Sequence, residues 1–191
     1  LPGLVGMGII QVTIVVNTGF ASSLEEGANS WIFWADRLLE LPLSLFAVSL
    51  GTALLPTLSQ HISRNEKEEM LSTSQRFLRL IFYVSIPCAV GIYILAEPIV
   101  EVLFKRGKFT DHDVQMTARV LAIYSIAILA YSGVRVIVSS FYAVKNTTFP
   151  AIVSVVCLGI HIAVAPFLMK QYGVEGLVFS TVLSYRSQVI Q

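Results

Sequence analysis

The sequence predicts an all-α, polytopic membrane protein with about six transmembrane helices. Hydrophobic residues make up 55% of the chain, charged residues 13%, and the mean hydropathy is +0.74, whereas a typical soluble domain has about 45–50% and about 25%. Residues 1–24 and 147–169 carry no charge apart from one His in the second run, and both runs exceed the roughly 20 residues that cross a bilayer as a helix. Neither run alternates in polarity, as the strands of a membrane barrel would.

The first helix is expected over residues 2–20. Pro2 suits the opening turn of a helix. Gln11 and Asn17 are expected to face protein or water, because lipid cannot satisfy their hydrogen bonds, and we interpret them as residues that hold helices together rather than as ligands. The polar residues 21–29 form the following loop.

The second helix is expected over residues 30–62. Trp31 and Trp34 lie near its start, where amphipathic rings favour a membrane interface. Pro42 and Pro56 lie inside it, and each removes a backbone hydrogen bond and favours a kink.

The third helix is expected over residues 78–96. A charged, solvated connector at 61–79 precedes it, and we expect the second half of this connector to be a helix that lies along the surface or enters the third helix. Residues 98–106 are too polar to span the membrane, but their apolar positions follow helical spacing. They predict a short interfacial helix, which Gly107 would end.

The last three helices are expected over residues 111–144, 148–169 and 173–191. Thr110 and the early acids Asp111 and Asp113 suit the N-terminus of the first of these, because they satisfy free amides and the helix dipole. The chain begins inside one hydrophobic run and ends in another. We therefore expect it to be an excerpt of a longer protein.

Three charged side chains, Asp36, Arg37 and Glu40, lie inside the second predicted helix. An Asp, Lys or Arg at the bilayer centre costs about 2.5–3.5 kcal/mol, so three isolated charges would cost roughly 8–10 kcal/mol. Such residues persist when they line a water-filled interior, pair with one another or contact a charged substrate. Asp36 and Glu40 share one helix face, and Arg37 can reach Glu40 at i+3.

Arg37 is the strongest candidate for a substrate-binding residue, with Asp36 and Glu40 beside it. Its planar guanidinium can bind phosphate or carboxylate with two hydrogen bonds, which Lys cannot do. The alternative is an interhelical or interface ion pair that only fixes the helix position.

Arg135 is the second candidate. It lies in a polar stripe that could line a cavity, although Arg135 could equally reach an interface or cap a neighbouring helix. The stripe also contains Tyr131, Ser132, Ser139 and Tyr142. His161, alone in an apolar helix, is more often a hydrogen-bonded structural residue than a proton carrier.

The sequence contains no recognisable enzyme motif. We find no Gly-rich phosphate loop, no Walker lysine, no HExxH pattern and no nucleophile with an evident base. We therefore expect no catalytic residue, no cofactor and no metal site. No basic tract suggests nucleic acid as a partner.

Three motifs, at residues 35–42 (ADRLLELP), 50–59 (LGTALLPTLS) and 103–110 (LFKRGKFT), closely resemble those of the MurJ/MviN lipid II flippases. This family belongs to the multidrug/oligosaccharidyl-lipid/polysaccharide exporter superfamily. The motifs occur in the family's order and spacing, and the resemblance extends over nearly the whole chain.

The resemblance implies that residues 1–191 are part of the C-terminal lobe of a two-lobe transporter in the bacterial cytoplasmic membrane. The family moves the undecaprenyl-pyrophosphate-linked peptidoglycan precursor between leaflets by alternating access. The implied partners are this precursor, membrane lipids and the missing N-terminal lobe. The role of the family's cavity arginine transfers to Arg37, the roles of Asp36 and Glu40 transfer less directly, and Arg135 falls where relatives tend to carry a basic residue.

Two other functions remain open from the sequence. One is another exporter of the superfamily, either a drug/cation antiporter or a polysaccharide-lipid flippase, against which the motifs at 35–42 and 103–110 argue. The other is a non-transporting membrane scaffold whose polar groups only mediate assembly.

Overall fold

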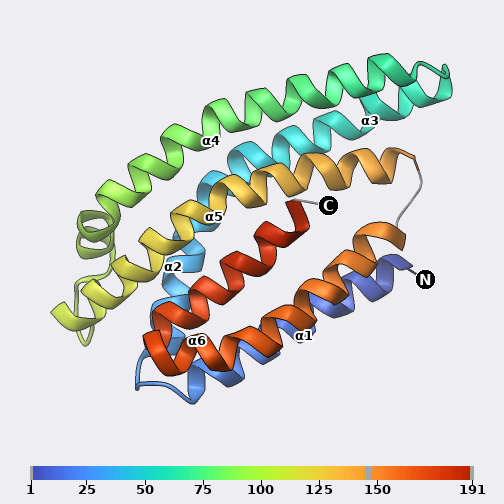
Figure 1. Ribbon diagram of the computed structural model, residues 1–191. Coiled ribbons are helices and arrows are strands. Elements are labelled where there is room, and N and C mark those ends of the chain that lie inside the picture. Colours follow the sequence, from blue (N-terminus) through green and yellow to red (C-terminus); the bar gives the residue numbers. More distant parts are fainter. Residues whose placement is uncertain (1, 145–147, 190–191) are drawn as a thin grey trace.

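The computed structural model is an all-helical membrane bundle over the residues it describes (Figure 1). It describes residues 2–144 and 148–189, with side chains described for 11–46, 49–134, 136–144, 148–150 and 152–183. In order, the elements are α1 (Pro2–Ser22), α2 (Ala28–Pro42), the π-helix η1 (Leu43–Val48), α3 (Ser49–Ser63), α4 (Lys67–Phe104), α5 (Asp111–Ala143) and α6 (Thr148–Val189).

Helix α5 is the centre of the bundle. It contacts α2, α3, α4 and α6, whereas α1 lies mainly along α6 (Figure 1). The main core cluster joins Leu121, Tyr124 and Ile128 of α5 to Trp31 and Leu39 of α2. The fold of the described chain therefore depends on burial around α5, and α2 is held directly against it.

The second predicted helix, 30–62, forms one path of three elements, α2, η1 and α3. The π-helix η1 begins directly after Pro42. Proline has no N–H and its ring crowds the preceding turn, and a wider π turn accommodates such a disruption without ending the helix. Ser49 Oγ donates to the Ser44 carbonyl at 3.2 Å, five residues back, which matches the π spacing.

The third helix is longer than the predicted 78–96, and the prediction of a separate interfacial helix at 98–106 was wrong. Both belong to α4, which runs through Pro87 and Pro98. Ala89, Ala96 and Val100 are all buried, so the same packed face continues past Pro98 and outweighs the lost hydrogen bond. At about 1.5 Å per residue α4 exceeds the roughly 30 Å hydrocarbon core, and its charged beginning extends beyond it.

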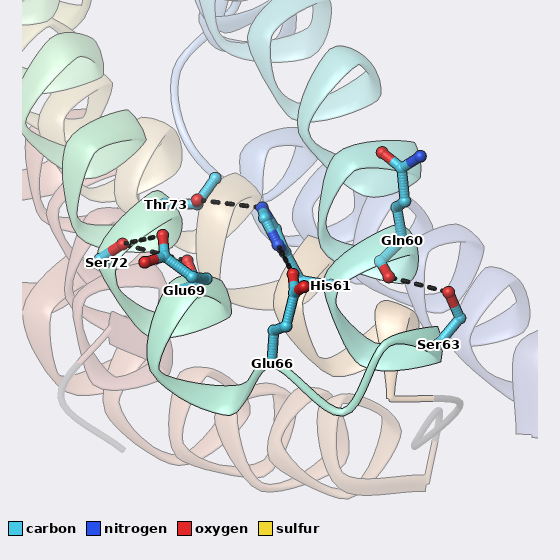
Figure 2. Close-up of polar contacts among 7 residues, drawn as sticks. All are labelled: Gln60, His61, Ser63, Glu66, Glu69, Ser72 and Thr73. Atoms are coloured by element: carbon cyan, nitrogen blue, oxygen red, sulfur yellow. Dashed lines mark hydrogen bonds and ion pairs between the residues drawn. The ribbon is translucent and has the colours of Figure 1, made fainter.

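The connection between α3 and α4 is a tight turn, shorter than the predicted connector at 61–79, and the second half of that connector is helical and belongs to α4, as expected. Figure 2 shows the His61 ring between Glu66 and Thr73, with 2.9 Å from Nδ1 to Glu66 Oε2 and 3.5 Å from Nε2 to Thr73 Oγ1. Asn65 takes a positive φ of 61°, which Asn tolerates better than most residues. These contacts fix the two helices against each other at this end.

The predicted helices 148–169 and 173–191 are the two halves of α6, divided by Gly173. Its φ of 56° and ψ of −130° are non-helical, and a positive φ costs glycine little. Figure 1 shows the second half, in red, returning from this bend toward the interior of the bundle.

Four helices of the described chain are long and apolar enough to cross a membrane, compared with the six predicted. They are Ala28–Ser63, Lys67–Phe104, Asp111–Ala143 and Thr148–Leu183. The number is lower partly because α6 counts once although Gly173 divides it. In addition, the side chains of α1 are described only from residue 11.

His161 links α1 to both halves of α6. It is 2% exposed, its Nε2 lies 2.8 Å from Asn17 Oδ1, and its Nδ1 lies 3.2 Å from Ser180 Oγ. These contacts confirm the structural interpretation of His161 and of Asn17. Within the apolar part of a membrane protein such bonds also satisfy groups that lipid would leave unpaired.

Replacing His161 with Leu in the full-length protein should lower its free energy of unfolding by about 1–3 kcal/mol, since Asn17 and Ser180 lose a buried partner. Unfolding in detergent would measure this change. A double-mutant cycle with Asn17→Ala should give a coupling energy near 0.6 and at most about 1.7 kcal/mol, the range for hydrogen bonds between membrane helices. Strict additivity of the two changes would show that the bond contributes nothing.

Candidate functional site

Helix α2 has one face turned toward the bundle and one turned away from it. The buried face carries Ala28, Trp31, Ala35 and Leu39, all at most 1% exposed, at the three- and four-residue spacing of a helix stripe. Arg37 is two positions after Ala35, about 200° around the helix at 3.6 residues per turn. Arg37 therefore projects from the side that the packed core does not cover.

Arg37 and Glu40 form an ion pair on this outward face. Arg37 Nη1 donates to Glu40 Oε2 at 2.6 Å, and the two side chains are 58% and 56% exposed. The Arg37 guanidinium carbon also lies 5.2 Å from the centre of the Phe33 ring, within the range of a cation–π contact. The predicted i, i+3 contact is confirmed, and both groups that hold the guanidinium come from α2 itself.

Asp36 is exposed beside this pair. Among the described residues, the hydrogen-bond partner of the Arg37 guanidinium is Glu40 rather than Asp36. A guanidinium has five N–H donors, so its bond to Glu40 leaves donors that can engage an oxyanion. An exposed ion pair contributes only about 0–1 kcal/mol, and a phosphate can displace or share it.

The exposed charges constrain what lies against this face. Ala28–Ser63 has the length and composition of a membrane span, and charges in contact with hydrocarbon would cost several kcal/mol. No other helix of the described chain pairs with Arg37. The face therefore suits contact with water or with polar groups outside this bundle, and it can bind an anion.

Two residues of the predicted polar stripe on α5 pack against neighbouring helices. Ser132, 1% exposed, accepts a hydrogen bond from Ser85 of α4 at 2.9 Å. Ser139 Oγ donates to the Gly51 carbonyl of α3 at 3.2 Å. These two residues hold helices together instead of lining a cavity. Arg135 lies in α5, but its side chain is outside the described part of the structure.

A contact that the sequence did not reveal joins α2 to the beginning of α5. Trp31 Nε1 donates to Asp113 Oδ1 at 2.8 Å. Asp113 Oδ2 accepts from the Thr110 amide at 2.7 Å, within a capping box that confirms Thr110 as the N-cap of α5. The sequence singled out Trp31 as an interfacial ring and Thr110 with Asp113 as a helix N-terminus. It gave no sign that they meet, because Trp31 and Asp113 are 82 positions apart.

Aromatic rings extend this contact to the turn between α4 and α5. Trp34 and Phe104 have ring centres 4.7 Å apart, and Phe104 and Phe109 lie 6.1 Å apart. Residues 103–110, singled out as a motif, therefore pack beside the start of α2. The motif at 35–42 follows on the same helix.

Comparisons with known proteins agree on one family. The family model described as "Lipid II flippase MurJ" matches residues 1–191. The chain is 53% identical over 184 residues to a probable lipid II flippase MurJ of Bdellovibrio bacteriovorus, covering 96% of this chain and 35% of the relative. It is 37% identical over 179 residues to one of Buchnera aphidicola, covering 94% and 35%. The chain thus spans about a third of the length of these curated relatives.

Solved structures give the same result for the fold. The chain superposes on a structure of "Lipid II flippase MurJ, inward closed conformation" with a TM-score of 0.87 and 27% identity, covering 97% of this chain and 39% of that one. A multidrug resistance MATE family transporter in an outward-facing conformation matches with a TM-score of 0.81 and 17% identity, covering 99% and 41%. At that identity, the second match shows the fold alone.

Proposed function

The chain belongs to the lipid II flippase MurJ family, and from this premise we propose that it is part of the C-terminal lobe of a lipid II flippase. The full-length protein moves the undecaprenyl-pyrophosphate-linked peptidoglycan precursor across the bacterial cytoplasmic membrane for cell-wall synthesis. It alternates access between this lobe and an N-terminal lobe. Membrane lipids surround the apolar helices.

Arg37 contributes a binding group for the pyrophosphate of the precursor. The observation that carries this assignment is the position of Arg37 on a membrane-spanning helix, exposed on the face opposite the packed stripe. Its guanidinium fits two phosphate oxygens. A cavity between two lobes would supply the water and the substrate charge that this face requires.

Asp36 and Glu40 tune the charge around Arg37 or take part in ion coupling. Glu40 already holds the guanidinium, so substrate binding would redistribute charge among the three groups. Arg135 adds a second basic residue to the cavity. Residues 1–191 contain no nucleotide-binding motif, and within this portion the proposed source of transport energy is an ion gradient or the membrane potential.

Complementation tests the proposal directly. The full-length protein that contains this chain should restore growth to a bacterial strain depleted of its own lipid II flippase, and it should restore exposure of the precursor on the outer leaflet. A well-expressed, membrane-inserted protein that restores neither would overturn the proposed function. Transport of small cationic dyes instead would favour a drug/cation antiporter.

A further inference from the structure

The rotation of α2 about its own axis decides where Arg37 points. Trp31 lies on the buried face at 1% exposure, and Arg37 follows it by six positions, about 120° away around the helix at 3.6 residues per turn. Any group that fixes the Trp31 ring therefore also fixes the direction of Arg37.

The indole ring of Trp31 is tightly packed against its neighbours. A Cβ at Gly27 would come within 2.8 Å of Trp31 Cζ2, so the ring packs directly on the Gly27 backbone. The His112 ring meets it edge-on at 5.4 Å. The N–H of the indole points to one acceptor, Asp113 Oδ1 at 2.8 Å. A buried indole N–H requires such a partner.

The Asp113 carboxylate is itself held from the other side. Oδ2 accepts from the Thr110 amide and from Thr110 Oγ1, both at 2.7 Å. One carboxylate thus uses one oxygen for the cap of α5 and the other for α2. Asparagine could not serve both sides, because its amide has a single acceptor oxygen.

Two ion pairs span the turn that presents Asp113. Lys105 Nζ lies 2.7 Å from Glu101 Oε1 and 2.7 Å from Asp111 Oδ1, and so it joins the end of α4 to the beginning of α5. Lys105 belongs to the motif at 103–110 and Arg37 to the motif at 35–42. Trp31 shortly precedes one motif and Asp113 shortly follows the other, so their hydrogen bond joins the chain next to the two motifs.

We propose that Asp113 is a positioning residue for the Arg37 site: through Trp31 Nε1 it sets the rotation of α2 so that Arg37 and Glu40 face away from the bundle. This inference rests on the proposed function only for its effect on transport. Its structural part, the coupling of α2 to the cap of α5, stands by itself.

Trp31→Phe in the full-length protein tests the proposal, because it keeps an aromatic side chain and removes the N–H. It also removes the indole atoms that lie on Gly27, so Asp113→Asn, which leaves the indole in place, is its companion variant. Trp34→Phe is the matched control, since Trp34 lies on the same helix and its ring also contacts an aromatic residue, Phe104. Spin labels on Ser30→Cys of α2 and Gln115→Cys of α5, both exposed positions, report the distance between the helices. Transport is measured in the same preparations.

We expect Trp31→Phe to shift or broaden the distance distribution and to lower the transport rate about tenfold, while Trp34→Phe keeps the distance and changes the rate less than twofold. Asp113→Asn should reproduce the distance change. An unchanged distance in both Trp31→Phe and Asp113→Asn would overturn the coupling whatever happens to transport. A changed distance with undiminished transport would overturn the positioning role. Failure of the proposed function itself would appear separately, as no transport by the unsubstituted protein.

Discussion

Arg37→Ala in the full-length protein is expected to abolish growth of a strain that depends on it as its lipid II flippase. Removing one partner of a hydrogen-bonded charge pair costs about 2–5 kcal/mol, and each 1.4 kcal/mol is a tenfold change in affinity. Binding of the pyrophosphate should therefore weaken by about 30-fold or more. Colony formation after depletion, with immunoblots for expression, measures the outcome.

Two further variants make this result specific. Arg37→Lys keeps the charge but loses the planar fork, so it should restore growth only weakly. Arg119→Ala is the matched control: Arg119 is also an exposed arginine, 63% accessible, but it lies on α5 and pairs with Glu175 of α6 at 3.3 Å rather than with a charged residue of α2. It should support normal growth. Full growth of Arg37→Ala at normal expression would refute the role assigned to Arg37.

Gly176→Ala should be among the most destabilising small substitutions in the chain. A Cβ at this position would collide with the backbone of the first half of α6, namely the Leu168 carbonyl and, at 3.1 Å, the Met169 nitrogen. Backbone atoms cannot rotate away as a flexible side chain does, so the two halves of α6 must separate. Overpacking of this kind costs about 1–3 kcal/mol and sometimes more, and thermal unfolding of the full-length protein in detergent would detect it.

Gly159→Ala provides the matched control on the same helix. Nothing lies within 4 Å of the position that its Cβ would take, and alanine favours the helical backbone over glycine by about 1 kcal/mol. Gly159→Ala should therefore be neutral or slightly stabilising. Equal stability of the two variants would show that the halves of α6 do not approach closely at Gly176.

Much of the helical organisation could be predicted because its signals are local. The N-cap of α5 follows from Thr110 and the acids of the first turn, and the structure contains that capping box. The bend in α6 follows from Gly173. The length of α4 did not follow, because proline and charge at 97–98 suggested an end. Burial of Val100 against the bundle outweighed both.

For the candidate site, the sequence predicted the Arg37–Glu40 contact because i and i+3 residues meet on any helix. It did not predict that Ser132 and Ser139 would be used for packing between helices. Their partners, Ser85 and Gly51, lie 47 and 88 residues away. From the sequence alone, a small polar residue that faces a cavity cannot be distinguished from one that faces another helix.

By itself, the sequence determined that this protein is an all-helical membrane protein and that Asp36, Arg37 and Glu40 lie together on one helix. Hydropathy and helical spacing act within a few turns, so they need no knowledge of the rest of the chain. Only the tertiary structure decided which side of α2 faces α5 and which side presents Arg37. That choice depends on the packing of Trp31 against Gly27, His112 and Asp113. His112 and Asp113 are far from Trp31 in sequence and reach it only when the bundle packs.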